Sequence, residues 1–273
     1  SNGHACPALY AILAKAGYFP EFKLNDLRKL GSGLEGHPRR GFLPGIEISS
    51  GSLGMGLSQG IGLASGLRLN KANNKVVVVM MSDGEHDEGS VWEAIMSASQ
   101  FKLNNLIAIV DRNGTQIGGF TEEQMALEPL AKKYLSFNWH VLEVNGHNFG
   151  QIITAFSKAY QMSGPTVIIS HTKGCKGLSF MEGKSNVHNP KITQDFYTFI
   201  EVERAFGVFF CFAPPFYFFR FFGPGLGKKI NDFVECRIQR IAKKHIFERR
   251  VHERAKHGFN SFWFSKLVEL AIF

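Results

Sequence analysis

Cysteine is scarce in this chain, and its few cysteines lie far apart. The 273 residues include four cysteines, Cys6, Cys175, Cys211 and Cys236, and no two of them form a Cys-x-x-Cys pair. This spacing argues against a structural zinc site and against a disulfide scaffold. It fits a reducing compartment, and the sequence therefore predicts a cytoplasmic protein.

Apolar runs long enough for a membrane span are also missing. The uncharged run 205–219 has 15 residues, and Pro214 and Pro215 interrupt it. A transmembrane helix needs about 20 consecutive apolar residues. The chain also begins without the pattern of a signal peptide. We therefore expect no membrane anchor, and we interpret this run as buried or covered by a partner.

The composition changes near residue 190. Residues 191–273 hold 17 of the 26 phenylalanines and 6 of the 8 net positive charges. We therefore predict a domain over 1–190 and a Phe-rich basic tail of unknown role over 191–273. A basic helix could lie on nucleic acid, but no nucleic-acid-binding motif is present, and we expect no such partner. A shifted reading frame would produce the same change of composition, so the sequence leaves open whether the tail folds.

The most informative stretch is 75–115, which has the pattern strand, turn, helix, strand, turn. Residues 76–80 and 106–110 are short, continuous apolar runs, as expected for strands buried on both faces. Asp83-Gly84 follows the first run, and the second ends in Asp-Arg-Asn-Gly at 111–114. The carboxyl ends of neighbouring parallel strands meet at one edge of a sheet. Asp83 and Asn113 should therefore lie side by side.

These side chains have the chemistry of a divalent-cation site. A carboxylate, an amide oxygen and a nearby backbone carbonyl are hard oxygen ligands that suit Mg²⁺ or Ca²⁺. They leave coordination positions for phosphate oxygens and water. Gly84, which has no side chain, lets the backbone approach a phosphate closely.

The remainder of 1–190 continues the alternation of strands and helices. We expect a helix over 121–134, a strand over 138–144, a helix after residue 148 and a strand over 165–172. A helix near the amino end and another beginning near residue 53 flank a Gly- and Pro-rich loop. The pattern predicts an α/β fold with a doubly wound parallel sheet and helices on both faces.

The stretch DGEHDEGSVWEA…NLIAIVDRNG is similar to the thiamine-diphosphate motif, which has the pattern Gly-Asp-Gly, about thirty residues, then Asn, and in particular to the form found in transketolases. The resemblance begins at SNGHACPALYAILAKAG and continues through GHPRRGFLPGIEISSGSLGMGLSQG to PTVIISHTKG and SFMEGKSNVHN, about residues 1–190. It is most like the short amino-terminal subunit of a split transketolase. Two positions depart from the family: Ser82 replaces its first glycine, and Gly118-Gly119 replaces Asp-Gly.

The resemblance implies thiamine diphosphate and Mg²⁺ (or Ca²⁺) as cofactors, and a role for each matching residue. The implied metal ligands are Asp83, Asn113 and the carbonyl of Thr115. Contacts to the cofactor are implied for His4, Gly51, Leu53, Gly84 and Asn113. The implied catalytic residues are His37 and His188, which handle substrate hydroxyls, and Glu88, which lies at a subunit interface.

The same resemblance implies a partner. The glutamate that activates the aminopyrimidine belongs to a separate pyrimidine-binding domain, and 191–273 is too short to be one. We therefore expect a carboxy-terminal transketolase subunit, in a homo- or hetero-oligomer, and transfer of a two-carbon ketol unit between sugar phosphates, as in the pentose phosphate pathway. Residues preceding Ser1 are also expected. Three alternatives stay open: a catalytically silent subunit of the same fold, a deoxyxylulose-phosphate synthase-like enzyme, and an interaction protein defined by its basic tail.

Overall fold

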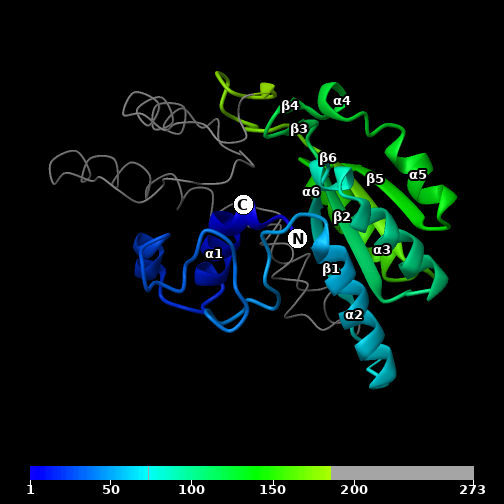
Figure 1. The fold of residues 1–273 in the computed structure, drawn as a ribbon, viewed down its shortest axis with the longest axis horizontal. Helices are drawn as coiled ribbons and strands as arrows, with labels where there is room; N and C mark the ends of the chain where they lie inside the picture. The colour runs from blue at the N-terminus through cyan, green and yellow to red at the C-terminus, as the bar shows by residue number, and fades with distance from the viewer. Residues whose placement is uncertain (73, 186–273) are drawn as a thin grey trace, which may run out of the picture. The chain divides into compact units, whose positions relative to one another are not determined.

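A computed structural model describes residues 1–72 and 74–185, all of which belong to one compact unit. The predicted tail 191–273 and the predicted catalytic residue His188 lie outside these residues. The unit is built on a four-stranded sheet, drawn in Figure 1.

The sheet is parallel throughout, as predicted. Its strands are β1 (Val77–Ser82), β2 (Leu106–Arg112), β6 (Thr166–His171) and β5 (His140–Asn145), in the order β1-β2-β6-β5. In this register Ser82 lies beside Asp111, and Arg112 lies beside His171. The residues that follow β1 and β2 therefore emerge next to each other at the carboxyl edge.

Helices cover both faces of the sheet. The helices α2 (Met55–Leu69), α3 (Gly89–Gln100) and α5 (Leu130–Ser136) share one apolar core with alternate residues of β1, β2 and β6. The helix α6 (Phe149–Ala159) packs on β5 and β6 and is not part of that core. Connections between parallel strands cross over in the right-handed sense. The chain moves across the sheet in one direction from β1 to β2 and from β2 to β5, and in the opposite direction from β5 to β6. The helix α6 therefore lies on the other face of the sheet from α3 and α5 (Figure 1).

Two local predictions were wrong. The helix expected over 121–134 is two helices, α4 (Thr121–Gln124) and α5, separated by residues 125–129, the last of which is Pro129. Proline lacks an N–H group and disfavours a helical conformation in the residue before it. The strand β1 is also not buried on both faces, since Met80 is 47% exposed. Within the described sheet β1 is an edge strand, whereas β2 and β6 are central.

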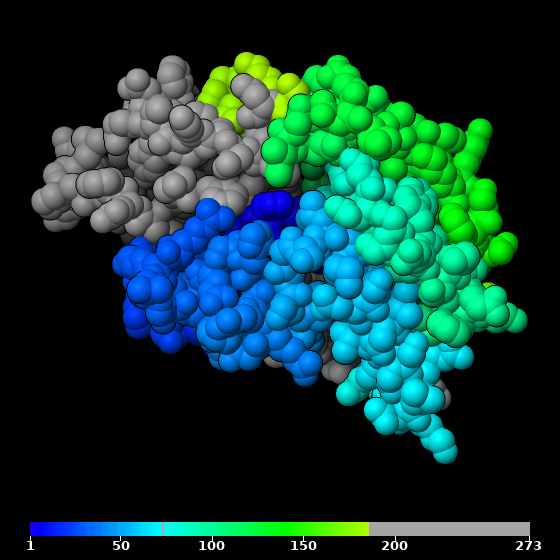
Figure 2. Space-filling model, viewed as in Figure 1, coloured from blue at the N-terminus to red at the C-terminus, as the bar shows by residue number. Residues whose placement is uncertain are grey.

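The amino-terminal segment forms a second small core beside the sheet. It comprises the short helix η1 (Gly3–Ala5), α1 (Cys6–Lys15) and η2 (Glu21–Asp26), followed by the predicted loop that leads to α2. Tyr10 and Leu34 are among its buried residues. Figure 2 shows this segment in blue, next to the lighter blue of α2.

Short elements complete the carboxyl edge of the sheet. The helix η3 (Gly84–Asp87) follows β1, and a small hairpin of β3 (Thr115–Gln116) and β4 (Gly119–Phe120) follows β2. Among the helices described, none combines the length and the apolar character needed to cross a membrane.

Candidate cofactor and metal site

Asp83 connects the ends of β1 and β2. Its side chain is fully buried. Oδ2 accepts hydrogen bonds from the Gly114 N–H at 2.7 Å and from Nη1 of Arg112 at 3.1 Å, and Oδ1 accepts one from the Gly84 N–H at 2.8 Å. The predicted neighbours Asp83 and Asn113 are therefore joined through the residue that follows Asn113.

The buried position of Asp83 disfavours the ionised form of its carboxyl group. Burial raises the pKa of its carboxyl to about 6, and the nearby Asp111 carboxylate acts in the same direction. The hydrogen bonds from Gly114 and Arg112 oppose this rise. A carboxylate taken out of water in this way is stabilised by a cation bound to it.

Asn113 is oriented by its neighbours. Its Nδ2 donates to Oδ2 of Asp111 at 3.0 Å, and Asp111 also accepts a hydrogen bond from the Thr172 hydroxyl. The Asn113 Oδ1 accepts from the Thr115 backbone N–H at 2.8 Å and from the Thr115 hydroxyl at 2.7 Å. Asp111, a residue that the sequence placed only in a turn, thus decides which end of the Asn113 amide faces Thr115.

The donor set of these residues fits a divalent cation in its chemistry. Within residues 1–72 and 74–185 no group of three or more His, Cys, Asp or Glu side chains could hold a metal, so such a site depends on amide and carbonyl oxygens. Asp83, Asn113 and Thr115 supply that set from two adjacent strand ends. The buried Oε1 of Gln116 has no hydrogen-bond partner, and a Cβ atom on Gly84 would come within 2.8 Å of it. An acceptor without a donor therefore borders Gly84, where a cation or its water would be stabilised.

Three further predicted residues lie together at the amino end. The rings of His4 and His37 meet edge to face, with their centroids 5.6 Å apart. Gly51 has φ +136°, and a Cβ atom there would lie 3.2 Å from the His37 ring. Burial lowers the pKa of His4, and His37 lowers it further. Both features favour a neutral His4 imidazole.

Glu85 connects Ser1 and the start of α2 to the end of β1, and the sequence did not reveal this role. Its buried carboxylate accepts hydrogen bonds from the Gly54 N–H at 3.0 Å, from the Ser82 N–H at 2.9 Å and from the Ser1 hydroxyl. Gly54 directly precedes α2 and has φ +78°, a left-handed conformation that favours glycine. The only sequence signal for Glu85 was its place directly after Asp83-Gly84.

The remaining predicted residues are distributed as follows. Leu53 is half-buried next to Gly54. Glu88 is exposed and is the N-cap residue of α3, although its side chain makes no capping hydrogen bond. A surface position is compatible with the predicted place of Glu88 at a subunit interface, which stays a prediction. The Ser82 hydroxyl, a departure from the family pattern, lies 3.4 Å from Glu85 Oε2 and donates to it.

Arg112 is the second residue that sequence reasoning missed. Its side chain is 9% exposed. Besides its bond to Asp83, it donates to Glu122 at 2.8 Å, to Glu128 at 2.9 Å and to the Thr121 hydroxyl at 2.8 Å. The sequence offered no signal for this role, because three of these partners lie beyond the β3–β4 hairpin.

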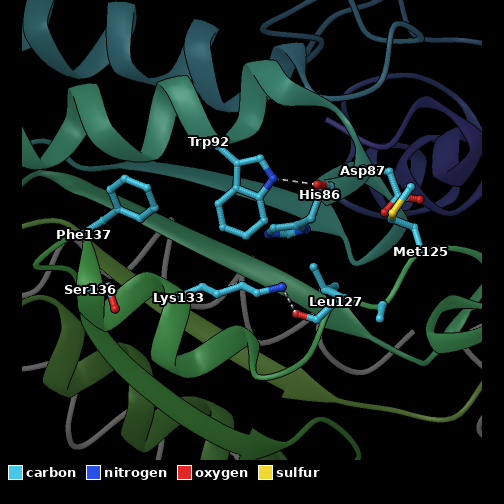
Figure 3. Close-up of a pocket in the computed structure, with 9 residues that line it drawn as sticks. His86, Asp87, Trp92, Met125, Leu127, Lys133, Ser136 and Phe137 are labelled. Carbon is cyan, nitrogen blue, oxygen red and sulfur yellow. Dashed lines mark hydrogen bonds between the residues drawn. The ribbon is translucent and has the colours of Figure 1, made fainter.

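A buried hydrogen-bond chain supports the turn from the other side. His86 Nε2 accepts from the Tyr134 hydroxyl at 2.9 Å, and Nδ1 lies 3.0 Å from the Asp83 carbonyl oxygen. Burial lowers the pKa of His86, so the neutral ring donates through Nδ1 and accepts through Nε2. Trp92 Nε1 donates to the His86 carbonyl at 2.8 Å (Figure 3). The helices α3 and α5 thereby hold the turn that presents Asp83.

An open pocket of about 510 Å³ borders this chain of hydrogen bonds. Figure 3 shows Trp92 and Phe137 on one side of it, and Lys133, which donates to the Leu127 carbonyl at 2.7 Å, on another. None of the predicted cofactor or metal residues lines it. The pocket is therefore separate from the candidate site.

A parallel α/β sheet that presents polar side chains at adjacent strand ends belongs to the class of open α/β folds, which bind their ligands outside the carboxyl ends of the strands. Comparison with known proteins gives the family. The model of the transketolase thiamine diphosphate binding domain matches residues 1–208. The chain therefore belongs to this family, as the sequence analysis predicted.

Curated relatives and solved structures agree. The chain is 44% identical to an apulose-4-phosphate transketolase subunit from Phocaeicola vulgatus, over 72% of this chain and 70% of the relative. It is 42% identical to the 6-deoxy-6-sulfo-D-fructose transketolase subunit SqwG of a Clostridium species, over 71% of each. A transketolase structure from Pichia stipitis matches with a TM-score of 0.69 at 26% identity, over 99% of this chain and 39% of that one. The chain thus spans about two fifths of that solved transketolase.

Proposed function

We propose that this chain is the cofactor-binding subunit of a split transketolase, and that it transfers a two-carbon ketol unit between sugar phosphates together with a second subunit. Two relatives that it matches over about 70% of their length are themselves named as transketolase subunits. The second subunit would carry the pyrimidine-binding domain. The observation that supports this proposal most directly is the junction of Asp83 with the Asn113–Thr115 turn.

The chain's own residues would hold the diphosphate through Mg²⁺. Asp83, Asn113 and the Thr115 carbonyl are the ligands, and Gly84 follows Asp83 without a side chain that would keep a phosphate at a distance. Thiamine diphosphate, when bound, supplies the carbanion chemistry of ketol transfer. Asp111 keeps the Asn113 amide in one orientation, and Glu85 keeps the turn after β1 against the start of α2.

The histidine pair would contact the cofactor and the substrate. His4 and His37 lie edge to face, and burial and mutual repulsion disfavour a proton on His4. A neutral imidazole near pH 7 both accepts and donates a hydrogen bond, which suits contact with diphosphate oxygens and sugar hydroxyls. We assign His4 to the cofactor and His37 to the substrate, with Gly51 and Leu53 lining the aminopyrimidine pocket.

The test is co-expression with a candidate carboxy-terminal transketolase subunit. We expect ketol transfer from a ketose phosphate to an aldose phosphate only when both chains, thiamine diphosphate and Mg²⁺ are present. The Asp83→Asn variant should assemble with the partner and show no transfer. Activity of either chain alone, or full activity of Asp83→Asn, would contradict the proposal.

A catalytically silent subunit of the same fold is the second candidate. The observation in its favour is that both oxygens of Asp83 and the oxygen of Asn113 already accept hydrogen bonds from the protein. Calorimetric titration of the two-subunit complex with thiamine diphosphate and Mg²⁺ separates the candidates. Cofactor binding without ketol transfer, or no binding at all, favours the silent subunit.

A further inference from the structure

Arg112 lies between Asp83, the proposed metal ligand, and a segment that begins at β4 and continues through α4. Its guanidinium makes four hydrogen bonds, one to Asp83 and three to Thr121, Glu122 and Glu128. The last three belong to residues 119–128, which we call the clamp segment. The buried guanidinium of Arg112 thus connects the end of β1 to a segment that supplies none of the predicted metal ligands.

The electrostatics of this arrangement affect Asp83 directly. The charge of Arg112 opposes binding of a second cation at Asp83, since like charges a few ångströms apart repel. Glu122 and Glu128 offset that charge at 2.8 and 2.9 Å, on the side of the guanidinium away from Asp83. They also hold the planar guanidinium group in one orientation, so that a single nitrogen of Arg112, Nη1, reaches Asp83.

The two glutamates are themselves fixed in place. Glu122 accepts hydrogen bonds from the backbone N–H groups of Leu127 and Glu128 at 3.2 and 3.3 Å, and Glu128 accepts one from Leu130 at 2.8 Å. Their side chains are nevertheless 44% and 49% exposed. A substitution at either position therefore changes the charge facing Arg112 without opening a cavity in the core.

We propose that Arg112 is a positioning residue for the metal ligand Asp83, and that through it Glu122 and Glu128 set the affinity of the site for a divalent cation. Without one of the two glutamates, less negative charge offsets the guanidinium charge beside Asp83. The guanidinium is also freer to turn and to donate to Asp83 through two of its nitrogens instead of one. Both effects weaken cation binding. Linkage requires the reverse as well: cation binding at Asp83 stabilises the clamp segment. The inference rests on the proposed function, because it takes Asp83 as a metal ligand.

The experiment measures Mn²⁺ binding by electron paramagnetic resonance on the complex of the full chain with its carboxy-terminal partner subunit, with thiamine diphosphate present. Glu128→Gln and Glu122→Gln should weaken Mn²⁺ binding about 3- to 10-fold, at or below the low end of the effect of losing an outer partner of a metal ligand. Glu123→Gln is the matched control, because Glu123 is exposed on the same helix α4 and is not among the partners of Arg112. The Mn²⁺ affinity of the Glu123→Gln variant should equal that of the unaltered chain.

Hydrogen exchange gives a second readout that a merely structural role would not change. Mn²⁺ should slow amide exchange across 119–128 in the unaltered chain and in Glu123→Gln, and less so in Glu128→Gln. Equal Mn²⁺ affinity in Glu128→Gln, Glu122→Gln and Glu123→Gln would overturn the inference and leave the proposed function standing. Failure of the unaltered chain to bind Mn²⁺, or full binding by Asp83→Asn, would overturn both.

Discussion

The carboxylate of Asp83 accepts a hydrogen bond from the backbone N–H of Gly114 at 2.7 Å, across the ends of two parallel strands. This contact brings the turn after β1 and the turn after β2 into one site. In the proposed site, the position of the Asp83 carboxylate therefore depends on the conformation of the Asn113–Thr115 turn.

The Asp83→Asn substitution should remove cation-dependent cofactor binding. Asparagine is nearly the same size but lacks the charge that a hard cation requires. We expect the dissociation constant for thiamine diphosphate in the presence of Mg²⁺ to rise by at least the 10- to 100-fold typical of lost support at a metal site. Isothermal titration calorimetry on the two-subunit complex measures this. An unchanged dissociation constant would remove Asp83 from the ligand set.

The Tyr134→Phe substitution should destabilise the protein through His86. Without the hydroxyl donor, the buried Nε2 of His86 loses its hydrogen bond. Leaving a buried acceptor unsatisfied costs about 1–3 kcal/mol. Chemical denaturation measures the loss in the free energy of unfolding. Ser136→Ala, on the same helix α5 and at an exposed hydrogen bond, is the control and should change that free energy little. Equal effects of the two substitutions would contradict the role assigned to Tyr134.

Replacing glycine by alanine should have opposite effects on stability at two positions of α2. A Cβ atom on Gly60 would lie 2.4 Å from Cγ2 of Val79 in β1, whereas one on Gly62 would meet no atom within 4 Å. Gly60→Ala should therefore cost about 1–3 kcal/mol by overpacking. Gly62→Ala should stabilise the protein by up to about 1 kcal/mol through helix propensity. Thermal denaturation of the two variants compares them directly, and a higher melting temperature for Gly60→Ala than for Gly62→Ala would contradict the packing of α2 on β1.

His4 should titrate below the ordinary histidine value of 6.5. Burial lowers its pKa most, and the neighbouring His37 adds to the effect. Nuclear magnetic resonance titration of the His4 ring measures the pKa. His37→Gln should raise the His4 pKa and leave it below 6.5, because burial remains. A His4 pKa above 6.5 in the unaltered chain would contradict this environment.

The lowered pKa of His4 also makes the stability of the protein depend on pH. Because the folded state holds the His4 proton more weakly than the unfolded chain, this contribution to stability is fully present above pH 6.5. It is lost as the pH falls from 6.5 through the lower folded-state pKa. The His4→Gln variant should lose less stability over that interval than the unaltered chain, as measured by denaturant unfolding at a series of pH values.

Several features could be predicted from the sequence because their causes are local. The runs at 76–80 and 106–110 are apolar, and residues that favour turns follow each, so both the strands and the meeting of Asp83 with the Asn113 turn could be anticipated. The helix expected over 121–134 failed for an equally local reason, since Pro129 interrupts it. The edge position of β1 was different, because strand order depends on pairing between segments distant in the sequence.

The sequence by itself determined the parallel α/β fold and the residue types at the strand ends, because hydrophobic pattern and turn chemistry are properties of neighbouring residues. The family followed from the resemblance of its motifs to those of transketolases. Only the tertiary structure showed what surrounds them. Arg112 reads as an ordinary turn residue until folding brings Asp83, Glu122 and Glu128 around it, and Glu85 has a role only once Gly54 and Ser82 lie beside it. Charges and hydrogen bonds between residues far apart in the chain follow from three-dimensional packing, which no local pattern contains.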